Sequence, residues 1–89
     1  MSFGAKHILV KTLGEAVNLR QMIVDGTPFE SAAIQSSLCP SKQNGGDLVM
    51  FNRGQMVPPF EQAVESLEVG GLSQPVQTQF GYHLIKRYA

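Results

Sequence analysis

The sequence lacks the features that mark several common classes of protein. Its 89 residues include a single cysteine, Cys39, so no disulfide can form within the chain. An unpaired thiol is more typical of a reducing compartment than of a secreted protein. No apolar run approaches the ~20 residues of a membrane span, and residues 1–6 contain no apolar signal-peptide core. We therefore expect a soluble cytoplasmic protein with no membrane partner.

The sequence also lacks an excess of charge of either sign. Seven basic residues balance seven acidic ones, and the formal net charge is +0. A general nucleic-acid-binding protein normally carries a basic field, so no nucleic-acid partner is expected. The basic residues near the chain ends, Lys6, Lys11, Lys86 and Arg87, are expected to be solvated. The small size and neutral charge favour a monomer, and residues 1–89 are long enough for one domain.

Periodicity and turn residues predict an α+β domain with the order βααβαββ. Thr12 and Glu15 form a capping-box pattern before a helix over 13–25, and Thr27 with Glu30 forms a second one before a helix that ends near Ser37. Pro58 and Pro59 suit the start of a third helix, which Gly70 and Gly71 end. Strands are predicted at 5–11, 48–51, 73–78 and 82–88, and residues 40–47 read as a loop.

Four polar side chains are candidates for chemistry. His7 and His83 are each flanked by aliphatic residues in a predicted strand, so both imidazoles are expected to be buried and to need partners. If the first and last strands are neighbours, each histidine could be the partner of the other. Both could equally be satisfied core groups. Cys39 and Thr78 could join them in a thiol hydrolase, but no oxyanion hole is evident, and the spacing argues against a metal site.

A set of apolar residues surrounds the start of the third helix. Leu48, Met56 and Phe60 are explained by an ordinary core on spacing alone. Met56 and Phe60 are four residues apart across the helix start, so both side chains can face one spot. A methionine beside a phenylalanine makes an adaptable apolar pocket of about the size of a pyrrolidine ring.

Four segments together resemble the parvulin-type peptidyl-prolyl isomerases. These segments are His-Ile-Leu-Val (7–10), Gly-Gly-Asp-Leu (45–48), Arg-Gly-Gln-Met-Val-Pro-Pro-Phe-Glu (53–61) and Thr-Gln-Phe-Gly-Tyr-His-Leu-Ile-Lys (78–86). They follow the parvulin order and spacing over nearly the whole chain, and the small bacterial stand-alone parvulins are the most similar members. The resemblance implies the parvulin (FKBP-like) fold, a four-stranded antiparallel sheet surrounded by helices, without a cofactor or metal.

The resemblance also implies roles for individual residues. His7, Cys39, Thr78 and His83 match the polar active-site residues of the family. The substrate-binding positions are Leu48, Met56 and Phe60, which match the proline pocket, and Phe80, which matches the loop beside the residue preceding proline. Gln55 and Phe51 lie nearby in the family pattern.

Two departures from the family pattern have physical consequences. Val49 stands where the family has glycine, and a positive φ there would strain a β-branched residue. The phosphate-directed members carry a basic loop after the first strand, whereas only Lys11-Thr12-Leu13-Gly14 is found here.

The sequence therefore predicts a non-covalent prolyl isomerase that is not phosphate-directed. It would act on X-Pro bonds in unfolded or flexible segments of proline-containing polypeptides and assist their folding. The alternatives are a peptide-binding chaperone module, which needs no such polar set, and a thiol hydrolase, which needs a reactive thiol.

Overall fold

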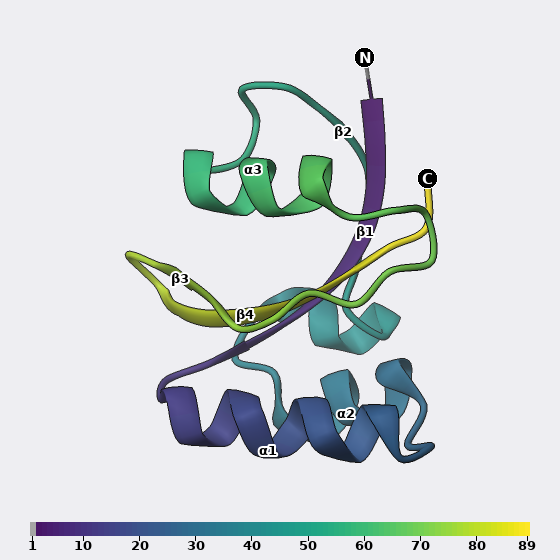
Figure 1. The fold of residues 1–89 in the computed structure, drawn as a ribbon, viewed down its shortest axis with the longest axis vertical. Coiled ribbons are helices and arrows are strands. Elements are labelled where there is room, and N and C mark those ends of the chain that lie inside the picture. Colours follow the sequence, from purple (N-terminus) through teal and green to yellow (C-terminus); the bar gives the residue numbers. More distant parts are fainter. Residues whose placement is uncertain (1) are drawn as a thin grey trace.

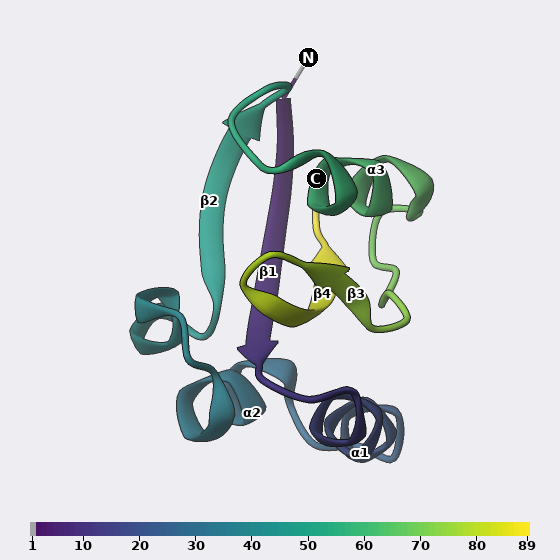
Figure 2. The same cartoon turned by 90° about the vertical axis from the view of Figure 1, so that its left-hand side faces the viewer.

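The computed structural model describes residues 2–89, in which the long strand β1 (Ser2–Val10) lies in the middle of the sheet. The remaining elements are α1 (Leu13–Val24), α2 (Phe29–Ser36), the 3-10 helix η1 (Pro40–Asn44), β2 (Asp47–Asn52), α3 (Pro58–Ser66), β3 (Val76–Thr78) and β4 (Gly81–Arg87). The sheet is antiparallel with the strand order β2-β1-β4-β3, as the views in Figures 1 and 2 show. The predicted α+β class and the order βααβαββ are confirmed, with η1 added inside the predicted loop.

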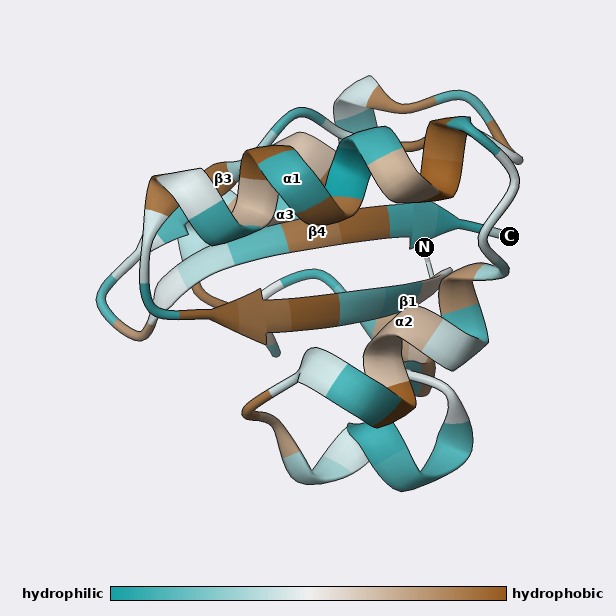
Figure 3. Cartoon of the chain, turned by 90° about the horizontal axis from the view of Figure 1, so that it is seen from below, coloured by the Kyte–Doolittle hydropathy of each residue, from teal (hydrophilic) through white to brown (hydrophobic). Residues whose placement is uncertain are grey.

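Helices cover both faces of this sheet because side chains alternate along its central strands. Figure 1 shows α1 and α2 on one side and α3 on the other. Ile8, Val10 and Leu84 pack under α1 and α2 around the fully buried Phe29, and Figure 3 shows the hydrophobic stretches of β1 and β4 that meet these helices. On the opposite face Ala5 and Ile85, with other apolar residues, pack against α3. Each large buried side chain contributes about 1.5–3 kcal/mol to folding.

The pairing of the first and last strands brings the two histidines together. In the β1–β4 register, His7 lies opposite Ile85, and Leu9 lies opposite His83. His7 and Leu9 are two residues apart on β1, so His7, Leu9, His83 and Ile85 all project from the face that α3 covers. The two histidines are thus diagonal neighbours on the paired strands β1 and β4. No local sequence pattern indicates that these two strands pair.

The helix starts agree with the sequence at α1 and differ at α2. Thr12 Oγ1 accepts a hydrogen bond of 3.2 Å from the backbone N–H of Glu15, as the first capping box predicts. The second capping box is not formed, because Pro28 takes the N-cap position with φ −59° and ψ 135° and makes no side-chain cap bond. The apolar residues Ala16, Leu19, Met22 and Ile23 follow one another at helical spacing, but Met22 is 47% exposed on α1.

The end of α3 also differs from the prediction, and Arg87 explains what stabilises it. The helix ends at Ser66 and not near Gly70, because Leu67 is extended with ψ 143°. Arg87 Nη1 donates to the carbonyl oxygens of Val64 and Leu67 at 3.3 and 2.8 Å. A cation at the C-terminus of a helix binds carbonyls that have no helical partner. The expectation that Arg87 is solvated is therefore wrong.

The segment that leads into β2 is closely joined to β1 beside His7. The backbone N–H of His7 donates to the carbonyl oxygen of Gly46 at 2.9 Å. Gly46 has φ +86°, and a Cβ at this position would collide with the carbonyl oxygen of His7. Val49 has φ +54° and is the one non-glycine residue with a positive φ within residues 2–89. The backbone at position 49 therefore has the positive φ that the glycine of the family pattern would adopt, although the residue is valine.

None of the helices within residues 2–89 combines the length and the apolar character needed to cross a membrane.

Candidate active site

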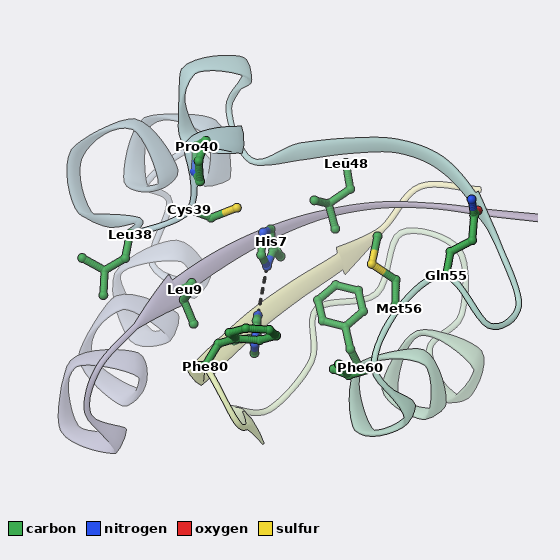
Figure 4. Close-up of a pocket in the computed structure, with 12 residues that line it drawn as sticks. His7, Leu9, Leu38, Cys39, Pro40, Leu48, Gln55, Met56, Phe60 and Phe80 are labelled. Atoms are coloured by element: carbon green, nitrogen blue, oxygen red, sulfur yellow. Dashed lines mark hydrogen bonds between the residues drawn. The ribbon is translucent and has the colours of Figure 1, made fainter.

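A cavity of about 480 Å³ opens on the α3 side of the sheet, between α3 and the segment that precedes η1. Figure 4 shows its walls: β1 and β4 form the base, and residues from four separate parts of the chain surround it. The twelve lining residues are His7, Leu9, Leu38, Cys39, Pro40, Leu48, Gln55, Met56, Val57, Phe60, Phe80 and His83. Seven of the eight predicted site residues thus line one cavity. The eighth, Thr78, lies behind His83.

The two histidines are joined at the base of this cavity. The Nδ1 atoms of His7 and His83 are 3.0 Å apart, and the dashed line in Figure 4 marks this hydrogen bond. Both side chains are buried. On its other side, His83 Nε2 lies 2.7 Å from Thr78 Oγ1, which also accepts from the backbone N–H of Phe80 at 3.2 Å. A proton between the two Nδ1 atoms requires one of them to be unprotonated. His7 Nε2 is buried without a hydrogen-bond partner among residues 2–89.

Phe60 seals this pair from the α3 side. The imidazole rings stack with centroids 5.2 Å apart and an interplanar angle of 17°. The Phe60 ring meets His7 and His83 edge-on, with centroids at 5.5 and 5.3 Å and angles of 81° and 83°. Such perpendicular contacts are among the favoured geometries of aromatic rings. Phe60 therefore contributes both to the histidine environment and to the apolar wall of the cavity.

Burial keeps both histidines neutral at physiological pH. Burial, and to a smaller extent the nearby His83, together lower the pKa of His7 from 6.5 to about 4. Burial also lowers the pKa of His83 from 6.5 to about 4. Removing an imidazolium from water is costly, so the uncharged form prevails. No lysine, arginine or carboxylate lines the cavity, whose base is therefore polar but uncharged.

Cys39 is positioned by Ser37, which sequence reasoning missed. The buried Ser37 Oγ accepts from the backbone N–H groups of Leu9 and Cys39 at 3.1 and 3.3 Å. The backbone N–H of Leu38 donates to the carbonyl oxygen of Leu9 at 2.8 Å. This segment is therefore fixed along β1. Within residues 2–89, no hydrogen bond joins Cys39 Sγ to either imidazole.

The cavity has two apolar ends with the polar groups between them. Leu48, Met56 and Phe60 form one end. The other end contains Leu9, Leu38 and the 59% exposed Phe80. Figure 4 shows Met56 and Gln55 at one end, and Leu38 and Phe80 at the other. An extended peptide can therefore lie along the cavity with one residue at each end.

Sequence reasoning missed four lining residues, and one of them had a usable signal. Leu9 follows His7 by two residues in a strand, so it must face the same way. Leu38 and Val57 lie on connecting segments and Pro40 begins the short helix η1, where no periodicity applies. Phe51, which the resemblance put near the site, lies in the core and packs on Phe60 with ring centroids 6.2 Å apart.

Metal binding finds no support in the geometry of the described chain. Among residues 2–89, no three His, Cys, Asp or Glu side chains converge in a way that could hold a metal ion.

Comparison with known families decides which class this cavity belongs to. The family model described as the PPIC-type PPIase domain, a rotamase, matches residues 7–89. The chain belongs to the parvulin-type peptidyl-prolyl cis/trans isomerases. The match begins at His7 and includes every residue of the cavity, so the predicted family and enzyme class are confirmed.

Relatives within this parvulin family include foldases of much greater length. The chain is 46% identical over 83 residues to foldase protein PrsA of Caldanaerobacter subterraneus. The aligned region covers 92% of this chain and 27% of that protein. It is 47% identical over 81 residues to foldase protein PrsA 4 of Bacillus cereus, over 90% of this chain and 29% of that protein. The chain thus spans less than a third of the length of these curated relatives.

Solved parvulin structures have the same fold. The crystal structure of PrsA from Bacillus subtilis matches with a TM-score of 0.95 and 38% identity, over 99% of this chain and 35% of that one. The solution structure of NmPin, the parvulin of Nitrosopumilus maritimus, matches with a TM-score of 0.88 and 37% identity, over 99% of this chain and 96% of that one. The second comparison indicates that a chain of nearly this extent can form the whole parvulin fold.

Proposed function

We propose that this parvulin domain isomerises X-Pro bonds in unfolded or flexible polypeptide segments without a covalent intermediate and without a phosphate on the substrate. The observation that carries the proposal is an apolar pocket, formed by Leu48, Met56 and Phe60, beside a base of buried neutral histidines. The pocket has room for a pyrrolidine ring, and the preceding carbonyl would lie near Cys39 and His7.

The proposed mechanism depends on the polarity of the rotating bond. Resonance gives the planar amide partial charges, and the uncatalysed barrier is about 18–20 kcal/mol. The twisted transition state loses that resonance and is less polar at the amide. A site that excludes water and carries no formal charge favours the twisted state over the planar one. Anchoring the proline ring at Phe60 would leave the preceding carbonyl free to rotate.

The position of Cys39 favours a non-covalent role over that of a nucleophile. A thiol nucleophile needs a base within hydrogen-bond reach. Neither imidazole is hydrogen-bonded to Cys39 Sγ within residues 2–89, and the two Nδ1 atoms are already paired with each other. In the proposal, Cys39 contributes to the environment of the rotating carbonyl.

The lining of the cavity supports independence from phosphate. A phosphate is normally held by arginine or lysine side chains or by a helix N-terminus. None of the twelve lining residues is a lysine or an arginine, and both histidines among them are neutral. Only Lys11 and Thr12 separate β1 from α1, which leaves no loop long enough for a cluster of basic residues.

Exchange NMR on a short unphosphorylated X-Pro peptide tests the proposal directly. We expect the protein to increase the rate of exchange between the cis and trans proline signals, with no cleavage product. A peptide-binding module would shift or broaden the signals without faster exchange, and a hydrolase would release fragments. Either of these results would exclude the proposed function.

The Cys39→Asp variant tests the non-covalent mechanism. An attacking thiol is essential to covalent catalysis, whereas an environmental group can be replaced by another polar one. We expect Cys39→Asp to retain substantial exchange activity. Loss of all activity, together with a thioester trapped on the unmodified protein and detected by mass spectrometry, would exclude the mechanism.

Several expectations from the sequence stay predictions. The cytoplasmic localisation, the monomeric state and the absence of nucleic-acid and membrane partners are of this kind. The periplasmic protein Cj1289 and the virulence factor PEB4 are named together as SurA-like chaperones in the description of a structure 36% identical to this chain. A periplasmic protein is thus named among the similar proteins, and the cytoplasmic localisation rests on the sequence alone.

A further inference from the structure

A second hollow adjoins the active-site cavity at Met56. It has a volume of about 460 Å³ and lies over the turn between β2 and α3 and along α3 as far as Glu65. Met56 lines both hollows, so one side chain forms the wall between them. The other residues that line the second hollow include Arg53, Gly54, Pro58, Glu61 and Glu65. The proposed isomerase function assigns no role to this second hollow.

The position of the hollow indicates which part of a substrate could reach it. If proline occupies the end formed by Leu48, Met56 and Phe60, its preceding carbonyl points toward Cys39 and the histidines. The chain before proline then runs toward Leu38 and Phe80 (Figure 4). The chain after proline must leave at the opposite end of the cavity. Met56 stands at that end, and the second hollow lies on its far side.

A hydrogen bond and an ion pair hold the walls of this hollow in place. Glu61 Oε2 accepts from the backbone N–H of Gly54 at 2.8 Å, which fixes the carboxylate against the turn. Arg53 Nη1 lies 2.8 Å from Glu65 Oε1, so these two charges neutralise each other. The remaining formal charge is the one on Glu61. The hollow therefore combines an apolar wall, formed by Met56 and Pro58, with one negative charge that no basic side chain within residues 2–89 pairs.

We propose that this hollow is a subsite for the residues that follow proline and that it favours a lysine or arginine there. The proposal rests on the isomerase function proposed above, because it uses the same orientation of the substrate. Lysine and arginine have apolar stems and cationic heads. The stem would lie on Met56 and Pro58, and the head would approach the carboxylate of Glu61.

The test compares peptides that differ only after proline. Blocked peptides with a central Leu-Pro bond would carry Lys-Lys, Ala-Ala or Glu-Glu at the two following positions, and exchange NMR would give kcat/KM for each. Partly exposed ion pairs contribute modestly, so we expect Lys-Lys to exceed Ala-Ala by about two- to fivefold at low salt. The ratio should approach one in about 1 M salt, where the Debye length is only ~3 Å.

Two variants with the same change of net charge locate the effect. Glu61→Gln removes the charge but keeps an oxygen that can accept from the Gly54 N–H, so the turn is retained. Glu15→Gln removes an exposed charge in the first turn of α1, on the other side of the sheet. We expect the Lys-Lys to Ala-Ala ratio to fall to about one in Glu61→Gln and to stay unchanged in Glu15→Gln.

Each possible outcome is decisive. Equal acceleration of all three peptides, a preference for Glu-Glu, or the same ratio in both variants would overturn the subsite. Moving the lysine pair to the N-terminal side of Leu-Pro should abolish the gain, and its persistence would indicate general charge attraction instead. Absence of acceleration for every peptide would refute the isomerase function itself, and the subsite with it.

Discussion

Val49→Gly should stabilise this protein, although most substitutions destabilise proteins. Val49 has φ +54°, in the left-handed region. For an L-residue this conformation costs about 1–2 kcal/mol, and a β-branched side chain is among the least suited to it. Val49 is 65% exposed, so its removal sacrifices little buried surface. The hydrogen bond from its backbone N–H to Asp47 Oδ1 at 2.8 Å would remain in glycine.

The expected increase in the free energy of unfolding is the strain energy relieved at position 49 minus the entropic cost of glycine. Glycine gives the unfolded chain more freedom, which costs about 0.5–1 kcal/mol relative to alanine. A net stabilisation of about 1 kcal/mol remains. For a domain of this size, 1 kcal/mol raises the Tm by about 4–8 °C. Urea unfolding at 25 °C and thermal unfolding by circular dichroism would measure both quantities.

Val69→Gly is the matched control for this effect. Val69 is 64% exposed, nearly as much as Val49, but its φ is not positive. Glycine there should lower the stability by about 0.5–1 kcal/mol, because only the entropic cost applies. Val49→Ala retains a Cβ and should fall between the wild type and Val49→Gly. If Val49→Gly destabilised the protein as much as Val69→Gly does, the reasoning from strain would be refuted.

Two further predictions concern the site. The pKa values of His7 and His83 are about 4 in the folded protein, against 6.5 in the unfolded chain, so their contribution to stability is complete above pH 6.5 and is lost toward pH 4. Urea unfolding should therefore show a loss of about 2 kcal/mol per histidine between pH 7.5 and 5.0, and a constant stability would contradict their burial. Met56→Ala should lower kcat/KM for an X-Pro peptide about tenfold, since losing most of a buried methionine contact costs about 1.4 kcal/mol. Lys42→Ala, an exposed change on η1 outside the cavity, should leave kcat/KM unchanged, and equal effects of the two variants would argue against the proline pocket.

The sequence predicted those parts of the site that depend on strand alternation and on family motifs. His7 and His83 were recognisable because a histidine among aliphatic residues in a strand needs a buried partner. Their pairing depended on β1 and β4 being neighbours, which local periodicity does not indicate and the family resemblance supplied. Val49 was recognisable in the same way, because it replaces a glycine whose backbone geometry the fold retains.

The unpredicted parts depend on contacts between distant segments. Ser37 positions Cys39 only because the chain after α2 lies along β1 and is bonded to Leu9. Arg87 binds the last carbonyls of α3 only because β4 passes beneath the end of that helix. Pro28 displaces the cap expected from Thr27, since its fixed φ suits the N-cap as well as the first helical position. No pattern within a single segment contains this information.

The low pKa values and the proposed catalysis have one physical cause. The cavity base disfavours a charged imidazole because Phe60 and the sheet exclude water from it. In the proposed mechanism, the same exclusion disfavours the more polar, planar amide relative to the twisted one. A histidine with an ordinary pKa would indicate a wetter base, which would solvate the planar substrate better and reduce the advantage of the transition state. Phe60 is thus expected to act on the reaction through the solvation of the whole site, and not only as one wall of the proline pocket.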